Sequence, residues 1–117
     1  MSMAQGASGT GDMKAVEKPP EVSEVSKRIL DAISNPERYA IMITLSHHRE
    51  GLSFSQLARV FTVNHNTLDR HLKTLTHATL VWNFYERREG KDHSFYRLST
   101  LGEKFLDSIK HGIELAA

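Results

Sequence analysis

The most constraining feature of the sequence is a pair of short helix patterns within residues 53–75, joined by a two-residue turn. Ser53 and Gln56 have the spacing of a capping box, which opens the first helix. Its expected apolar face is Leu57, Val60 and Phe61. Residues 62–63 form the turn, and Asn64 is placed to cap the second helix. The second helix carries leucines at i, i+4 and i+7: Leu68, Leu72 and Leu75.

Two further helices are predicted before this pair. Apolar residues recur at three- and four-residue steps over residues 22–33, which indicates a first helix with one apolar stripe: Val22, Val25, Ile29 and Ile33. Asn35 then offers an N-cap and Pro36 the favoured first helical position. The helix that they open is expected to bury three side chains, Ile41, Met42 and Leu45, and to end before Gly51.

After residue 78 the composition changes to runs typical of β-strands. LVWNFYERR and SFYRL flank the Gly-containing stretch EGKDH, and this order predicts a β-hairpin. Thr100 and Glu103 then repeat the capping-box spacing and begin a last helix. That helix carries an apolar stripe of Leu101, Phe105, Ile109 and Ile113. The fold class is therefore mainly helical α+β, with four helices, a hairpin and a final helix.

The chain of 117 residues has room for one domain. Residues 1–20 are small, Gly-rich and without apolar periodicity, so we expect a disordered tail and a single domain over residues 21–115. No apolar run is long enough for a membrane span and no secretory signal is recognisable, so the expected location is cytoplasmic. The absence of cysteine excludes disulfides, thiolate metal sites and a cysteine nucleophile.

The predicted second helix of the pair presents a polar face opposite its leucines. Asn66, Arg70, Lys73 and His77 lie near the centre of this face, with Thr67, Asp69 and Thr74 at its edges. Residues 38–98 carry nine Lys and Arg against five Asp and Glu, a net charge of +4, whereas the flanking segments together are at −3. Amide and guanidinium side chains can read bases, and backbone N–H groups and lysine can contact phosphate. The pattern fits a helix that enters a DNA major groove, although any solvent-exposed helix face is polar.

Metal binding and catalysis are weaker interpretations of the same residues. His65, His71 and His77 are spaced six apart, so on a helix they point in directions roughly 120° apart and do not chelate one ion. The sequence has no nucleophile, base and orienting group at a recognisable spacing, and it has no Gly-rich phosphate loop. We therefore expect no enzyme activity, no cofactor and no metal site.

From Asn35 to Ile109 the sequence resembles the winged helix-turn-helix transcriptional regulators of the ArsR/MarR type. The resemblance lies in six segments in the same order: NPERYAIMITL, LSFSQLARVF, NHNTLDRHLKTL, ATLV, RREGK and YRLSTLGEKFL. It implies a recognition helix over residues 64–78 and a two-stranded wing with its tip at residues 86–93. Two departures stand out, because the family usually has Gly at the position of Thr79 and often a small hydroxyl residue at that of Asp69. We expect the turn at Thr79 to have a different conformation from the family's. We expect the Asp69 carboxylate to accept a hydrogen bond from a cytosine amine or to pair with a neighbouring cation, because it would otherwise repel phosphate.

The resemblance also implies partners and contact residues. The expected partner is double-stranded DNA, bound by a homodimer that pairs through residues 22–33 and 100–115, as family members usually do. Asn66 and Arg70 are expected to read bases and Lys73 to contact phosphate or a base edge. The full expected DNA-binding set is Asn64, His65, Asn66, Thr67, Asp69, Arg70, Lys73, Arg87, Arg88, Lys91 and His93.

Two alternatives stay open at this point. Winged helices also serve as protein–protein interaction modules, and the hairpin aromatics Trp82, Phe84 and Tyr85 could mark such a surface, although packing under the wing is their commoner use. Many ArsR-type members sense metals, and three residues of the last helix share one face at i, i+4 and i+7: Asp107, His111 and Glu114. Because residues 98–100 lack the second half of the family's zinc site, an ordinary polar face is favoured there.

Overall fold

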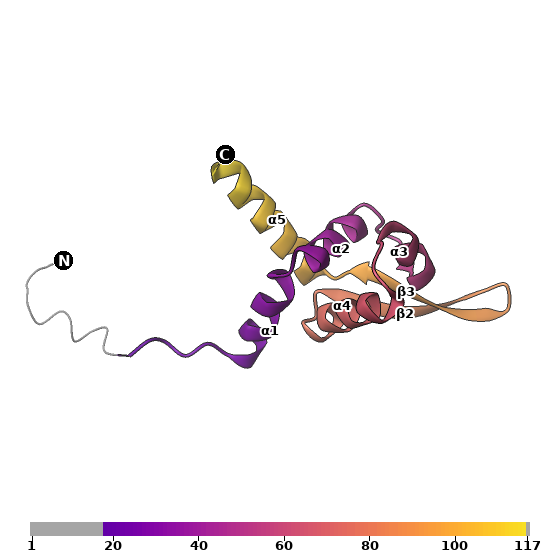
Figure 1. Cartoon of the computed structure of the whole chain (residues 1–117), viewed down its shortest axis with the longest axis horizontal. Helices are drawn as coiled ribbons and strands as arrows, with labels where there is room; N and C mark the ends of the chain where they lie inside the picture. The colour runs from indigo at the N-terminus through magenta and orange to yellow at the C-terminus, as the bar shows by residue number, and fades with distance from the viewer. Residues whose placement is uncertain (1–17, 117) are drawn as a thin grey trace, which may run out of the picture.

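The computed structural model describes residues 18–116, so most of the predicted tail of residues 1–20 lies outside the described residues. These residues form five helices and a small sheet, whose arrangement can be followed in Figure 1. In chain order they are α1 (Glu24–Ile33), α2 (Pro36–Ser46), β1 (Leu52–Ser53), α3 (Phe54–Val60), α4 (His65–His77), β2 (Val81–Arg88), β3 (Lys91–Leu98) and α5 (Thr100–Ala116). This is the predicted order with one added strand. Within residues 18–116 no helix is both long and apolar enough to cross a membrane.

The sheet has three antiparallel strands in the order β1-β3-β2, so the prediction of a two-stranded wing was incomplete. Leu52 and Ser53 of β1 pair with Tyr96 and Phe95 of β3. The predicted loop EGKDH is also shorter in the structure, because Arg88 pairs with Lys91 and leaves a two-residue turn. Both turn residues have a positive φ, 52° and 76°, as a type I′ turn requires. The tip of the hairpin projects well beyond the helices (Figure 1).

The hydrophobic core lies where α4 packs against α1, α2 and β2. The three predicted leucines of α4 and the three predicted apolar residues of α2 are all buried, and Leu57 of α3 and Leu80 join them. Val60 does not, because its side chain is 57% exposed near the end of the short α3. The prediction of Val60 as part of the inward face was therefore wrong.

The predicted caps of α2, α3 and α4 are confirmed. The Asn35 side chain accepts hydrogen bonds from two backbone N–H groups of α2, and Ser53 and Gln56 form the reciprocal capping box. Asn64 accepts a hydrogen bond of 2.8 Å from the N–H of Thr67 at the start of α4. These bonds satisfy N–H groups that have no partner within the helix.

The turn after α4 has the conformation that glycine usually adopts at this position, and the expectation of a different turn was wrong. The N–H of Leu80 donates to the Leu75 carbonyl at 3.1 Å, and the N–H of Thr79 donates to the Thr76 carbonyl at 3.0 Å. This is a Schellman motif, which places Thr79 in the left-handed region with φ of 60°. A β-branched residue is strained in this conformation, and the two hydrogen bonds hold it there.

The first and last helices do not bury the faces that were predicted for them. The last helix is capped by Ser99, whose hydroxyl accepts from the N–H of Gly102 at 2.9 Å, and not by Thr100. Gly102 and Leu106 are the buried residues of α5, whereas much of its predicted apolar stripe is exposed or only partly covered. The first helix begins at Glu24 after the Ser23 cap, and it buries Ile29 and Ala32.

Candidate nucleic-acid interface

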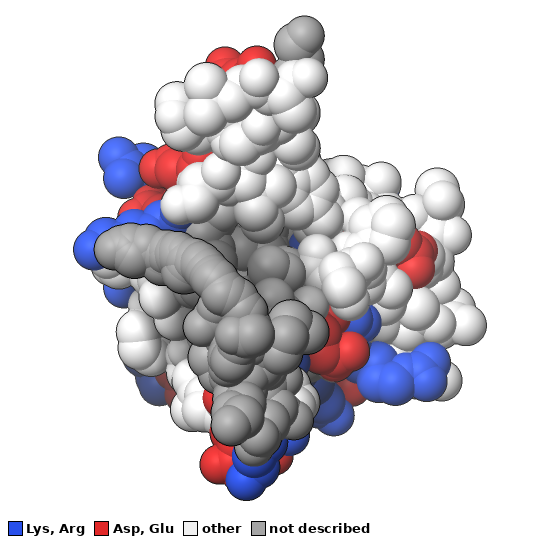
Figure 2. Space-filling view, turned by 90° about the vertical axis from the view of Figure 1, so that its left-hand side faces the viewer, with Lys and Arg blue, Asp and Glu red and all other residues white. Residues whose placement is uncertain are grey.

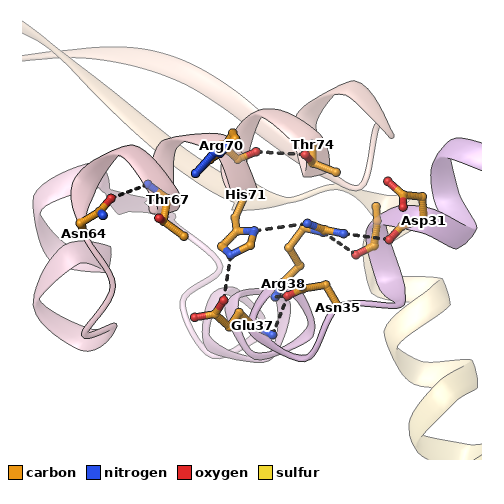
Figure 3. Close-up of polar contacts among 10 residues, drawn as sticks. Asp31, Asn35, Glu37, Arg38, Asn64, Thr67, Arg70, His71 and Thr74 are labelled. Atoms are coloured by element: carbon orange, nitrogen blue, oxygen red, sulfur yellow. Dashed lines mark hydrogen bonds and ion pairs between the residues drawn. The ribbon is translucent and has the colours of Figure 1, made fainter.

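The outward face of α4 begins with short polar side chains and continues with cations. His65, Asn66, Arg70 and Lys73 are exposed, and Thr67 and Asp69 are partly covered. The first turn is fixed by the Asn64 cap, and the hydroxyl of Thr74 donates to the Arg70 carbonyl at 3.0 Å (Figure 3). Since Leu68, Leu72 and Leu75 anchor the opposite face, the exposed side chains project from a rigid helix. A surface of this shape and chemistry can enter a major groove.

Asp69 lies among these cations and is paired with one of them. Its Oδ2 is 2.9 Å from Nζ of Lys73, one turn further along α4. This hydrogen bond, with the charge of the carboxylate, raises the pKa of Lys73. The pairing of Asp69 with a neighbouring cation is one of the two arrangements expected from the sequence, and it reduces the repulsion that a free carboxylate would exert on phosphate.

Tyr96 of β3 was not among the residues singled out from the sequence. Burial raises the pKa of its phenol, and the charges of Asp69 and Lys73 also act on it. The ring packs against the edge of the core. The alternation of β3 could have indicated this position, but the effect of the Asp69 and Lys73 charges on Tyr96 arises only in the folded chain.

The wing carries its cations in pairs with acidic residues. Arg87 Nη1 lies 3.4 Å from Asp92 Oδ1, and Arg88 Nη2 lies 3.1 Å from Glu86 Oε1. The guanidinium of Arg88 also lies over the Phe95 ring, 4.3 Å from its centroid. Within residues 18–116, Lys91 forms no ion pair, unlike Arg87 and Arg88. Surface pairs of this kind contribute little and can exchange for phosphate.

A shallow groove of about 280 Å³ separates α3 from the wing. Arg59, Arg88, Glu89 and His93 line it, together with the capping-box residues Ser53 and Gln56. The rings of Phe54 in α3 and His65 in α4 meet edge to face, with their centroids 5.5 Å apart. Arg59 was missed in the sequence because one arginine in a short helix carries no signal until the wing is placed beside it.

Two of the three hairpin aromatics lie on the surface. Trp82 is 54% exposed and Tyr85 is 71% exposed, whereas Phe84 stacks on Phe95 with ring centroids 5.7 Å apart. Only Phe84 packs under the wing as expected. The exposed pair is the feature of the hairpin that DNA binding does not explain.

The polar residues of the last helix do not gather into a metal site. Among residues 18–116 no three His, Cys, Asp or Glu side chains are placed so that they could hold one ion. Asp107, His111 and Glu114 are all exposed on α5, a helix that projects from the body of the molecule (Figure 1).

Comparison with known proteins places this geometry in a family. A sequence model described as a helix-turn-helix domain matches residues 22–81, which is 60 of the 117 residues. The chain is 28% identical to a transcriptional regulator homologue from Pyrococcus horikoshii OT3, with a TM-score of 0.59, over 79% of this chain and 96% of that one. No curated protein matches the sequence significantly.

Two more distant structures share the fold. A chain described as a MarR-family transcriptional regulator from Enterococcus faecalis V583 has a TM-score of 0.68 at 15% identity, over 86% of this chain and 90% of that one. MepR of S. aureus, in complex with DNA, has a TM-score of 0.66 at 15% identity, over 80% of this chain and 78% of that one. The helix-turn-helix match and the 28% identical transcriptional regulator homologue agree with the expectation of a non-enzymatic regulator. The chain belongs to the helix-turn-helix family, and its fold is the winged helix of ArsR/MarR-type transcriptional regulators.

Proposed function

We propose that this protein is a transcriptional regulator that binds a specific double-stranded DNA site as a homodimer in the cytoplasm, associated with the nucleoid. Each recognition helix, residues 64–78, lies in a major groove, and each wing, residues 86–93, lies on the flanking backbone. Residues 21–115 act as one domain. The observation that carries the proposal is the exposed face of α4, where Asn66, Arg70 and Lys73 project from a helix anchored by three buried leucines.

The side chains of this face have distinct expected roles. Asn66 can pair with adenine and Arg70 with guanine through two hydrogen bonds each. Lys73 reaches phosphate or a base edge once DNA replaces its contact with Asp69. Arg87, Arg88 and Lys91 of the wing supply backbone contacts, and His65, Thr67 and His93 complete the surface.

The homodimer is supported by apolar side chains that the single chain leaves uncovered on its terminal helices. On and beside α1 they are Val22, Val25 and Leu30, and on α5 they are Leu101, Ile113 and Leu115. Figure 2 views the side from which α5 projects, and the upper end of the molecule, formed by α5, is mostly uncharged with acidic atoms at its tip. Two such helices from each subunit can pair about a two-fold axis, which matches the symmetry of a palindromic site.

Selection of bound fragments from random duplex DNA tests the proposal. The purified protein is incubated with the library at two salt concentrations, and the recovered fragments are sequenced. We expect enrichment of one palindromic or pseudo-palindromic motif at both salts, with less recovery at the higher one. Sedimentation at micromolar concentration should give the mass of a dimer. Recovery of unenriched DNA, or a monomeric mass, would contradict the proposal.

A protein-binding role is the second candidate, and the exposed Trp82 and Tyr85 favour it. Aromatic side chains of this kind are enriched in protein interfaces. The two functions differ in their salt dependence, because DNA binding releases counterions and an apolar protein contact does not. Substitution of both aromatics by serine should leave DNA affinity unchanged if α4 and the wing carry the function.

A further inference from the structure

His71 is a buried polar side chain that the DNA-binding face does not use. It is 8% exposed on α4, between the anchoring leucines and the outward face. A buried imidazole without partners would be costly, so its contacts show what it does there. Both ring nitrogens have partners, and both partners come from α2.

The two contacts fix the state of the imidazole. Nδ1 lies 3.3 Å from Nη1 of Arg38, and Nε2 lies 3.1 Å from Oε1 of Glu37. A guanidinium can only donate, so Nδ1 accepts. The proton of the neutral ring is then on Nε2, where it donates to the carboxylate. The ring thus accepts on one side and donates on the other, which fixes its orientation.

Arg38 continues the chain of contacts to α1. Its Nε donates to the Ala32 carbonyl at 2.9 Å, and its Nη2 donates to the Asp31 carbonyl at 3.0 Å. Carbonyls in the last turn of a helix lack partners within the helix. The arginine supplies a donor to the Ala32 carbonyl and a further one to the Asp31 carbonyl, which also accepts from the hydroxyl of Ser34 at 2.8 Å. Figure 3 shows the result: one guanidinium joins the end of α1 to the middle of α4 through His71. We name these contacts the arginine bridge.

Directional hydrogen bonds restrain the angle between two helices more strictly than apolar packing does. The apolar residues that α1 buries are Ile29 and Ala32, and such contacts have no directional preference. Hydrogen bonds from a rigid, planar guanidinium are directional, and a lysine ammonium cannot reproduce them. Polar networks of this kind can fix one arrangement where apolar contacts would permit several.

We propose that Arg38 and His71 are positioning residues that set the spacing of the two DNA half-sites. The inference rests on the proposed function, in which α1 belongs to the dimer interface and α4 reads DNA. The arginine bridge then fixes each recognition helix relative to the two-fold axis. Two recognition helices held in this way fit half-sites about one helical turn apart, and they fit poorly when that distance changes.

The test measures affinity for the selected site and for the same site with two base pairs added between its halves. Arg38→Lys keeps the charge, so a change in the ratio of the two affinities reports geometry and not electrostatics. Arg49→Lys is the matched control, because Arg49 is exposed and, among residues 18–116, its one ion pair is with Glu103 on the surface. Dimer mass and thermal unfolding are recorded for every variant, and binding is measured well below the unfolding transition.

Wild-type protein and Arg49→Lys should prefer the selected spacing by about tenfold or more. In Arg38→Lys we expect this preference to fall to about threefold or less, with affinity for unrelated DNA unchanged. A preference equal to that of the wild type would overturn the role of the arginine bridge and leave the proposed function intact. A wild-type protein indifferent to spacing would overturn both.

Two substitutions at His71 give an independent test that does not depend on Arg38→Lys. His71→Leu removes both ring nitrogens, whereas His71→Gln retains one acceptor and one donor. We expect His71→Gln to keep more of the spacing preference than His71→Leu. Equal preferences in the two variants would show that the polar contacts of His71 do not position the helix.

Discussion

A single methyl group added at Gly102 should disrupt the junction between α5 and the rest of the fold. A Cβ at this position would lie 2.2 Å from the Leu80 carbonyl oxygen and 3.0 Å from Cδ1 of Leu98. The carbonyl cannot move away freely, because it accepts a hydrogen bond of 3.0 Å from the N–H of Ser99. The substitution Gly102→Ala must therefore shift either α5 or the turn after α4.

The expected cost follows from these two contacts. Overpacking of a filled site costs about 1–3 kcal/mol, and the loss of one backbone hydrogen bond adds about 1 kcal/mol. We expect Gly102→Ala to lower the free energy of unfolding by about 2–4 kcal/mol, and the midpoint of thermal unfolding by roughly 10–20 °C.

The same substitution at Gly112 of α5 is the control. A Cβ there meets no described atom of the same chain within 4 Å, so within one subunit only helix propensity changes. We expect Gly112→Ala to raise the free energy of unfolding by about 0.5–1 kcal/mol. Urea unfolding at one protein concentration measures both variants, because association of the proposed dimer adds to apparent stability. If Gly102→Ala is as stable as the wild type, the close contact with Leu80 does not exist as described.

Four further substitutions test the turn after α4 and the DNA-binding face. Thr79→Gly should stabilise the protein by about 0.5–1 kcal/mol in urea unfolding, because relief of the positive φ outweighs the entropy that glycine adds to the unfolded chain. A loss of stability would show that the backbone at Thr79 is not strained. Arg70→Ala should cost about 1–3 kcal/mol of binding free energy at the selected site and make the protein less selective for that sequence. Lys91→Ala should weaken binding to all sequences alike. Unchanged binding in both variants would contradict the proposed contacts of α4 and the wing with DNA. Asp69→Asn should lower the pKa of Lys73 in an NMR titration, since the hydrogen bond to Asp69 raises it. The stabilisation from this pair is present below the unfolded-state pKa of Lys73 and is lost as pH rises through the higher folded-state pKa.

The parts of the fold that were predictable depend on residues close together in the sequence. The caps at Asn35, Ser53 and Asn64 and the leucine stripe of α4 are local patterns, and all are present in the structure. The strand β1 was missed because its two residues show no alternation, and they become a strand only by pairing with β3. Val60 was misassigned because a helix of seven residues is too short for its period to define one face.

The candidate site also has a part that could be predicted from local sequence and a part that could not. The exposed face of α4 follows from helical geometry, so Asn66 and Arg70 could be placed outward from the sequence. The partners of His71 could not, since the arginine bridge joins side chains 33 and 34 residues apart and backbone carbonyls of a third helix. The left-handed conformation of Thr79 was not predicted, because the hydrogen bonds of the Schellman motif that hold it form only in the folded turn.

The central claim is that α4 and the wing bind DNA through its bases and its phosphates. It is tested most directly by measuring the affinity for the selected fragment at several salt concentrations. If Lys73, Arg87, Arg88 and Lys91 of both subunits contact phosphate, eight charges are neutralised, and log K should fall against log salt with a slope of about −7. A steep fall of this order is the predicted result. Affinity that does not change with salt would contradict the claim and favour a protein partner.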